Sequence, residues 1–218
     1  MQGILFKPEM IQAIEDGRKT VISRLNGLRE INKEPDKWEL FVHTPDDEGR
    51  VWFSNQLVEG SNTIVVKPRY KVGEVVYIKE AHYRYGHWRE TGGLTISGRV
   101  EWEFVAESDK VRYKENRPDF VLRATLRISG WYKRNPLFMP AWAARRFIMI
   151  TDVSAGRMQE IKYPDICAEG IDIYRPNLEP YLYGVLVGQF ISLWDSINKD
   201  YPWESNPWCF RYEFNKGE

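Results

Sequence analysis

A short turn near the start of the chain combines three residues whose types and spacing could do chemistry. Gly17, Lys19 and Arg24 lie between a predicted helix and a predicted strand. The turn holds an ammonium and a guanidinium at one place. A desolvated ammonium can act as a base or anchor a phosphate, and the planar guanidinium can grip a carboxylate, a phosphate or the edge of a base. The pattern therefore predicts a site at which an anion or a polar base docks.

Both cations also have plainer interpretations. Lys19 follows a helix C-terminus, where it could simply offset the negative end of the helix dipole, a surface effect of about 0.3–1 kcal/mol. Arg24 could be a solvent-exposed partner in a salt bridge, which contributes little to stability. The residue types alone leave these structural roles open beside the functional one.

A carboxylate with complementary chemistry occurs much later in the chain. Residues 163–168 are predicted to form a short helix with Gly170 beyond its end, which places Glu169 at the negative pole of that helix. That position disfavours the ionised carboxylate and suits a general acid or base near neutral pH. The alternative is a surface glutamate at the end of a helix.

Two hydroxyl groups near the cations are candidates for a nucleophile. Thr20 lies on the turn and Ser23 on the strand after it, whereas Ile22 can neither attack nor transfer a proton. Adjacent residues of a strand face opposite sides, so the Ser23 hydroxyl would point away from the position of Ile22. The catalytic candidates are therefore Lys19 as base, Glu169 as proton donor, and Ser23, Thr20 or a water molecule as nucleophile.

A second group of candidate binding residues occurs in two other segments. Trp142 is followed by Arg145 and Arg146, which suits a base stacked on the ring with phosphates nearby. Glu80 ends a predicted strand and could accept a hydrogen bond from an exocyclic amine. The alternative is a tryptophan that closes one end of the fold beside two exposed arginines. Residues 83–89 also interleave aromatic and basic side chains, but the pattern is unspecific and we expect a solvated loop.

Composition narrows the class of protein. The 218 residues include 31 Lys plus Arg and 31 Asp plus Glu, so a basic nucleic-acid site must be local rather than global. Aromatic residues reach 14%, with nine Trp, and such rings can either fill a core or stack on bases. The two cysteines, Cys167 and Cys209, form no CxxC pair and share no ligand spacing with the histidines, which argues against a structural zinc site. We expect no metal and no cofactor.

The same composition predicts a cytoplasmic protein without membrane association. Two scattered cysteines suit a reducing compartment. The first eight residues lack the apolar run of a signal peptide, and the longest apolar stretch, 182–194, is too short to span a bilayer.

The order of predicted elements indicates an α+β domain with a small, partly open β-barrel and flanking helices. Pro8 opens the first helix, and Gly17 closes it at a position that favours positive φ. A long helix is predicted over 178–198, with an apolar stripe at helical spacing that packs on a sheet. Polar turn clusters and glycines mark insertions at about 28–62 and 82–118 in a single domain, 1–218. Strands are predicted at 4–6, 38–42, 50–53, 64–66, 74–79, 99–104, 121–126, 147–150 and 208–214.

Gly17-Arg18-Lys19 with Arg24 resembles the G-x-K-x-x-x-x-R motif of the ASCH domain, a branch of the PUA-like superfamily. Four further segments resemble the larger ASCH proteins of phages and prophages, in the same order and over most of the chain. They are residues 71–80, 139–146, 165–171, and Leu193-Trp194 followed by 206–208.

The resemblance implies a PUA-like barrel with a cleft beside the first helix that binds RNA or modified bases. One small bacterial branch hydrolyses the acetyl amide of acetylated cytidine, and another is ribonuclease-like. The hydrolytic branch carries a threonine nucleophile at the position of Ile22, where much of the wider family carries a glutamate, and a glutamate at the position of Glu169. Isoleucine therefore departs from the pattern at the position on which the hydrolysis depends.

Three functions follow as expectations. The first is recognition of nucleic acid, RNA rather than DNA, or of a modified nucleobase, by Lys19, Arg24, Glu169 and a nearby aromatic ring. The second is an amidohydrolase acting on acylated cytidine or a related nucleoside. The third is a phage accessory protein whose barrel only mediates protein contacts.

Overall fold

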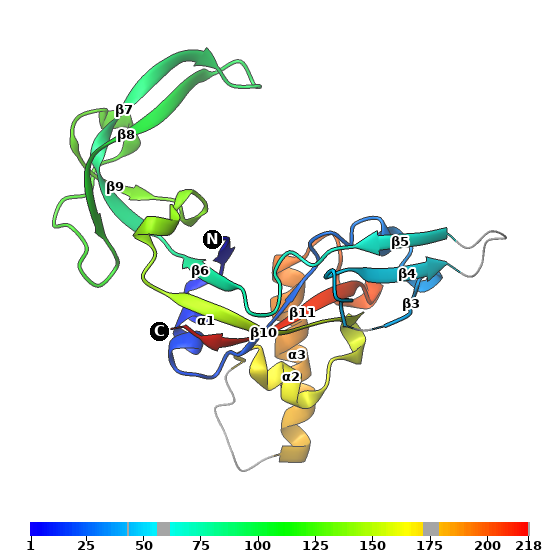
Figure 1. Cartoon of the computed structure of the whole chain (residues 1–218). Coiled ribbons are helices and arrows are strands. Elements are labelled where there is room, and N and C mark those ends of the chain that lie inside the picture. The colour runs from blue at the N-terminus through cyan, green and yellow to red at the C-terminus, as the bar shows by residue number, and fades with distance from the viewer. Residues whose placement is uncertain (43, 56–61, 172–178, 218) are drawn as a thin grey trace. The chain divides into compact units, whose positions relative to one another are not determined.

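The structure is a computed structural model of the chain, and it describes residues 1–42, 44–55, 62–171 and 179–217 (Figure 1). The described residues form three α-helices and eleven strands, which confirms the predicted α+β class. The chain divides into two compact units. We call Met1–Phe6 with Tyr77–Arg146 the hairpin unit, and Lys7–Val76 with Phe147–Glu218 the helical unit.

The helical unit is built on three antiparallel strands in the order β10-β11-β2. They are β10 (Phe147–Arg157), β11 (Trp208–Lys216) and β2 (Val21–Arg24). The alternating aromatic residues of β11 predict a strand with one buried face. Trp208, Phe210, Tyr212 and Phe214 are indeed at most 6% exposed, because strands on both sides and packed elements on its faces enclose β11.

The segment 28–62 contributes to this core. Leu28 and Ile31 are fully buried, and β4 (Val51–Asn55) places Phe53 edge-on against Trp208 with ring centroids 5.2 Å apart. β4 lies between β3 (Glu39–Leu40) and β5 (Asn62–Val66) in an antiparallel three-stranded sheet. The segment predicted as an insertion therefore supplies apolar side chains that the helical unit needs.

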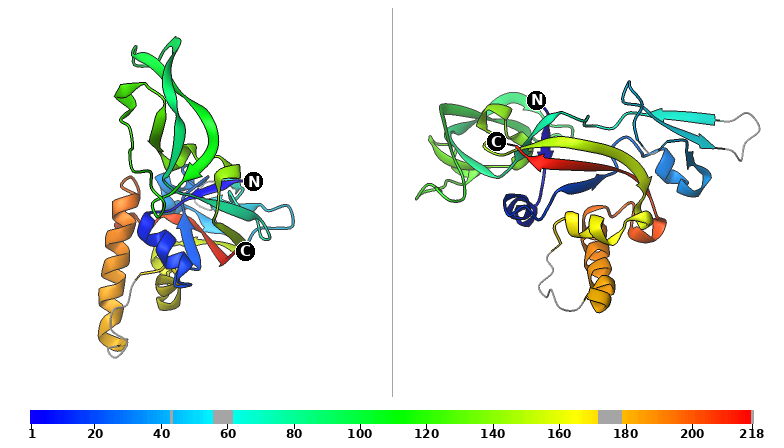
Figure 2. Two further views of the ribbon diagram at one scale, coloured as in Figure 1. Left: turned by 90° about the vertical axis from the view of Figure 1, so that its left-hand side faces the viewer. Right: turned by 60° about the horizontal axis from the view of Figure 1, so that its bottom comes forward.

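Helices α2 (Tyr163–Ala168) and α3 (Glu179–Ile197) pack together beside β11 (Figure 2). Leu186, Phe190 and Trp194 recur every four residues and are at most 4% exposed. They form a cluster with buried side chains of α2, β11 and the segment between β10 and α2. The predicted packing role of the long helix is confirmed, but its stripe is narrower than predicted, since Val185 and Ile197 are exposed and the Leu182 side chain lies outside the described part.

The hairpin unit is dominated by two long antiparallel strands, β7 (His82–Leu94) and β8 (Val100–Arg112). β9 (Gly130–Arg134) pairs with the other edge of β7. β1 (Gly3–Leu5) pairs in parallel with the end of β6 (Val75–Lys79), the strand along which the chain passes between the units. The solvated loop expected over 83–89 is wrong, because these residues belong to β7. The strand expected over 121–126 is also wrong, because Ala124–Leu126 form a 3-10 helix.

Across the described ranges, no sheet closes into a barrel, since each ends in two different edge strands. The prediction of one domain, 1–218, stays a prediction; the segment 82–118 lies in the hairpin unit and 28–62 in the helical unit. No helix in the described part of the chain is long and apolar enough to cross a bilayer.

Two substitutions on α3 test how this helix is packed. Phe190→Ala should lower the free energy of unfolding by about 3–5 kcal/mol, because the ring is 2% exposed and lies edge-on to Trp203. Gly188→Ala, two residues away, should raise it by about 0.5–1 kcal/mol, because a Cβ there meets no atom within 4 Å and glycine weakens a helix. Urea unfolding of both variants measures the effects. Equal and small effects would show that α3 does not pack through the Phe190 face.

Candidate functional site

The turn between α1 (Pro8–Glu15) and β2 places Lys19 inside the helical unit. Gly17 follows the end of the helix with φ of +73°, which confirms the predicted glycine with positive φ at this helix end. The backbone N–H groups of Arg18 and Lys19 both donate to the carbonyl of Ala13. This tight reversal turns the Lys19 side chain inward, where it is 1% exposed.

The Lys19 ammonium has an acceptor for each of its three hydrogens. Nζ donates to the Val21 carbonyl at 2.8 Å, to the Glu169 carbonyl at 2.8 Å and to Glu169 Oε2 at 2.6 Å. An ammonium has three donors and no acceptor, so this set satisfies it. Burial lowers the pKa of Lys19, and the charge of Glu169 opposes that shift.

Glu169 joins this arrangement from the end of α2. Its Oε1 accepts a hydrogen bond from the Ser23 N–H at 2.8 Å, and its backbone pairs with Lys19 in an isolated bridge. The Glu169 carboxyl group therefore contacts both the Lys19 ammonium and the backbone of β2. Gly170 follows with φ of +82°, and its Cα packs so closely on Lys19 that a Cβ would approach the lysine Cβ to 2.7 Å.

The ion pair lies along the free edge of β2. Strand β2 pairs with β11 through Ile22 and Arg24, and the carbonyl of Val21 and the N–H of Ser23 are bonded instead to Lys19 and Glu169. A side-chain donor and a side-chain acceptor thus take the place of a neighbouring strand. Removing one partner would leave a buried charge unpaired, which typically costs about 3–5 kcal/mol.

A recess of about 30 Å³ adjoins the pair. It is lined by Ile22, Ser23, Arg24 and Glu169, and by side chains of α1, α3 and the residue after α3. The volume holds one or two water molecules rather than a whole base. Arg24 is partly buried there, and burial lowers its pKa while the charge of Glu169 opposes the shift.

The hydroxyl groups predicted as nucleophiles do not meet the lysine. Ser23 contributes its backbone N–H to Glu169, whereas its Oγ is buried without a hydrogen bond of ordinary geometry and lies near the Cys209 thiol. Thr20 is exposed. Ile22 is 3% exposed, and its side chain carries no group that could attack or transfer a proton. Of the four catalytic candidates, the structure therefore joins only Lys19 and Glu169 through their side chains.

The remaining predicted binding residues lie in the hairpin unit and form an ion-pair network of their own. Glu80 is 9% exposed and accepts hydrogen bonds of 2.6–2.8 Å from both Arg145 and Arg146. Glu115 accepts two more from Arg145, and these hydrogen bonds, led by those to Glu80, raise the pKa of that guanidinium. The predicted acceptor and the predicted cations therefore bind one another. Trp142 is 56% exposed, with the Arg84 guanidinium 5.0 Å from its ring centroid.

Sequence reasoning missed an aromatic and basic face on β7, β8 and β9. Trp88, Phe104, Tyr132 and Arg134 gather there, although the sequence suggested a loop. The available signal was the period-two spacing of Arg84, Gly86 and Trp88. Among the described residues, no group of three or more His, Cys, Asp or Glu side chains is placed to hold a metal ion.

Gly17 and Gly170 both have positive φ, but only Gly170 packs against the ion pair. Substituting each by alanine therefore distinguishes the cost of positive φ from the cost of a clash with Lys19. Gly17→Ala should lower the free energy of unfolding by about 1 kcal/mol, the cost of positive φ, because nothing lies within 4 Å of the new Cβ. Gly170→Ala should cost about 2–4 kcal/mol, because it adds a clash with Lys19 and Ala13. Chemical denaturation checks both values, and equal losses would contradict the tight packing of Lys19.

The two thiols should differ in reactivity. Cys209 is fully buried, and burial raises its pKa to about 12, whereas Cys167 is partly exposed. At pH 8 iodoacetamide should modify the native protein at Cys167 alone, and Cys167→Ser should remain unmodified until it is unfolded. The unfolded Cys209 thiol loses its proton near 9, so the free energy of unfolding should fall as pH rises from about 9 to about 12. Native labelling of Cys209, read by peptide mass spectrometry, would contradict its burial.

Comparison of the chain with models of protein families, with curated proteins and with solved structures gives no match. The comparisons leave the ASCH resemblance neither supported nor opposed. The interpretation of the site therefore depends on its own geometry and chemistry.

Proposed function

We propose that the protein recognises nucleic acid, RNA or an unpaired or modified base, at the recess beside Lys19 and Glu169, on a fold of the PUA-like ASCH type. The observation that carries the proposal is the meeting of the turn cation with a carboxylate 150 residues later, at a recess that Arg24 also lines. A binding cleft at this turn is what the resemblance implies.

In this proposal each side chain has a distinct role. Lys19 is enclosed, so it holds the Glu169 carboxylate in place rather than touching the ligand. Each carboxylate oxygen has a second lone pair, so Glu169 can still accept a hydrogen bond from an exocyclic amine. Arg24 supplies a positive, planar donor group for a carbonyl or a phosphate. The recess size fits an exocyclic group of a base, with the rest of the ligand outside.

Recognition is supported over hydrolysis by the partners of Lys19. A lysine that acts as a base must reach a hydroxyl or a water molecule within about 3 Å. Here the three hydrogens of Nζ are directed at oxygens of Val21 and Glu169, and Ile22 stands where the nucleophile would be. The chain therefore keeps the cation and the acid without the group that would attack an acyl amide.

Arg24 provides the most direct test. Arg24→Gln should weaken binding of a fluorescent single-stranded RNA about tenfold, the loss of one charge-assisted hydrogen bond, and should reduce the slope of log K against log salt by about 0.7 if that bond is to a phosphate. Arg29→Gln removes the same charge from an exposed position outside the recess and should change affinity less than twofold. Fluorescence anisotropy at several salt concentrations measures both, with the matching DNA strand as a comparison.

Equal affinities of wild type, Arg24→Gln and Arg29→Gln would contradict the proposed recess. Turnover of acylated cytidine by the wild type, read by mass spectrometry and abolished in Lys19→Met, would replace recognition by hydrolysis. Near-ultraviolet circular dichroism separates a change at the site from loss of the fold.

A further inference from the structure

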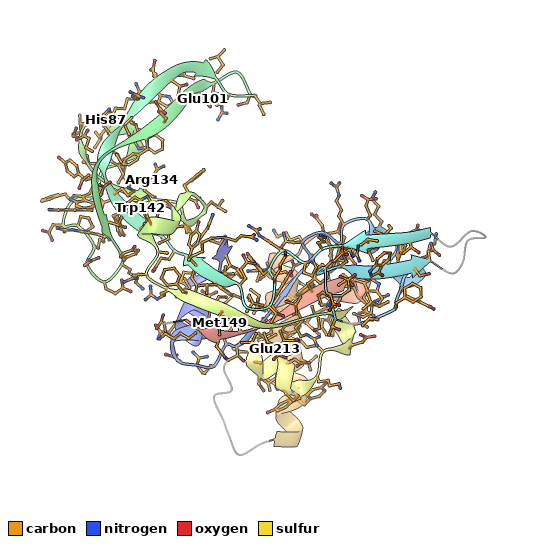
Figure 3. All side chains as sticks on the ribbon, viewed as in Figure 1. His87, Glu101, Arg134, Trp142, Met149 and Glu213 are labelled. Atoms are coloured by element: carbon orange, nitrogen blue, oxygen red, sulfur yellow. The ribbon has the colours of Figure 1, made fainter. Side chains whose placement is uncertain are left out.

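The inner face of the curved β7–β8 hairpin carries rings and arginines from three strands. Figure 3 shows Arg134 and Trp142 on the inner side of the hairpin and His87 on its outer side. The register explains this division, because Trp88 is opposite Phe104 and the next residue, Arg89, is opposite Glu103. Successive residues of a strand face opposite sides, so Trp88 and Phe104 lie on the inner face and Arg89 on the outer one.

The aromatic rings of the inner face form a continuous series. Trp88 and Phe104 meet edge to face with centroids 5.6 Å apart, and Phe104 and Tyr132 do so at 5.7 Å. Gly86 leaves room for this series, because a Cβ there would approach the Phe104 ring to 2.8 Å and the Val105 carbonyl to 2.1 Å. The backbone of β7 at Gly86 therefore accommodates the Phe104 ring, which lies at the centre of the series.

Arginines cover the rings and have few carboxylate partners. The Arg134 guanidinium lies 4.3 Å from the centroid of Phe104 and 4.8 Å from that of Trp88, and Arg84 lies over Trp142. In the described part of the chain neither Arg84 nor Arg134 forms an ion pair. Burial, and then the charge of Arg84, lower the pKa of Arg134. Two neighbouring cations thus remain uncompensated on this face.

Acidic groups of the hairpin concentrate on the other side. Glu103 pairs with Arg89 at 2.6 Å, and Glu107 pairs with His87 on the outer face. On the inner face Glu90 lies 3.9 Å from Arg127, which in turn covers Trp102. The charges of the sheet are therefore segregated, with paired charges outside and mainly arginines over rings inside.

Two buried donors of the inner face lack acceptors. Trp88 Nε1 and Arg84 Nε are both enclosed without a hydrogen-bond partner. A buried donor without an acceptor costs about 1–3 kcal/mol, and both groups can only donate. Because both atoms are enclosed, they reflect the close packing of this face and are not themselves contacts for a ligand.

We propose that the inner face of the β7–β8–β9 sheet is a stacking surface for an unpaired nucleic-acid strand. The inference depends on the proposed nucleic-acid function but uses none of the residues of the recess. Trp142, which is more than half exposed, offers a ring on which a base can stack. The guanidinium groups of Arg84 and Arg134, which form no ion pair in the described part of the chain, lie over rings of the same face and attract phosphates. A duplex cannot use the rings, because its bases are stacked on one another. An acidic peptide would satisfy the arginines but has no flat acceptor-bearing groups for the rings.

The test uses the full chain and a fluorescent single-stranded oligonucleotide of mixed sequence. Trp142→Ala and Arg134→Gln should each weaken binding about tenfold, the scale of one lost stacked base. Trp52→Ala, a partly exposed ring of the helical unit, and Arg89→Gln, on the outer face of β7, should each change affinity less than twofold. Trp142→Phe should recover most of the affinity because it keeps a ring, and Arg134→Lys should recover little because it lacks the planar group.

The outcomes separate this surface from the recess. Loss in Trp142→Ala and Arg134→Gln with unchanged binding in Arg24→Gln supports the surface and overturns the recess. Loss in Arg24→Gln alone overturns the surface and leaves the recess. Loss in all three supports both, and a wild type that binds no strand overturns both. Equal binding of a matched duplex or of an acidic peptide also overturns the proposed surface.

Circular dichroism is the control for folding. If Arg134→Gln loses its circular dichroism signal, Trp142→Ala decides, because Trp142 is exposed on a short 3-10 helix.

Discussion

The Lys19 ammonium and the Glu169 carboxylate bond the free edge of β2 where a further strand would otherwise pair. The organisation of the site depends on these hydrogen bonds. An unpaired strand edge needs donors and acceptors in alternation. Lys19 donates to the Val21 carbonyl, and Glu169 accepts from the Ser23 N–H, while the two side chains neutralise each other. Both charges can be buried because each is paired and hydrogen-bonded. The pair thereby fastens the end of α2 to the turn after α1, although the two segments are far apart in sequence.

The same closure limits the chemistry that the pair can do. The three hydrogens of the Lys19 ammonium are directed at two carbonyls and a carboxylate oxygen, so this side chain holds the Glu169 carboxylate in place. The hairpin unit uses its cations in two other ways. Arg145 and Arg146 are neutralised by Glu80 and stabilise the fold locally. Arg134 is instead held over aromatic rings without a carboxylate, which leaves its charge available to an incoming anion.

How much the sequence could predict depended on the range of the interactions. Periodicity identified α3 and the buried residues of β11, because burial of one face is written into local spacing. The partnership of Lys19 with Glu169 was reachable only through the family resemblance. The pairing of Glu80 with Arg145 could not be predicted from the sequence, because residues 65 apart meet only once the strands are aligned. The strand character of 83–89 was missed because aromatic and basic residues suit either an exposed loop or a half-buried face.

Equal numbers of acidic and basic residues do not prevent a protein from having a local affinity for anions, provided that the charges are sorted in space. In this chain two groups of charged side chains are neutralised inside the fold: the Lys19–Glu169 pair, and Glu80 with Arg145 and Arg146. On β7 and β8 the charges are separated between two faces of the sheet. Glu103 and Glu107 are paired on the outer face, and Arg84 and Arg134 lie on the inner face. Pleating is what makes this possible, because alternate residues of one strand serve two surfaces of opposite character. A neutral sequence can in this way present a face on which arginines and rings outnumber carboxylates.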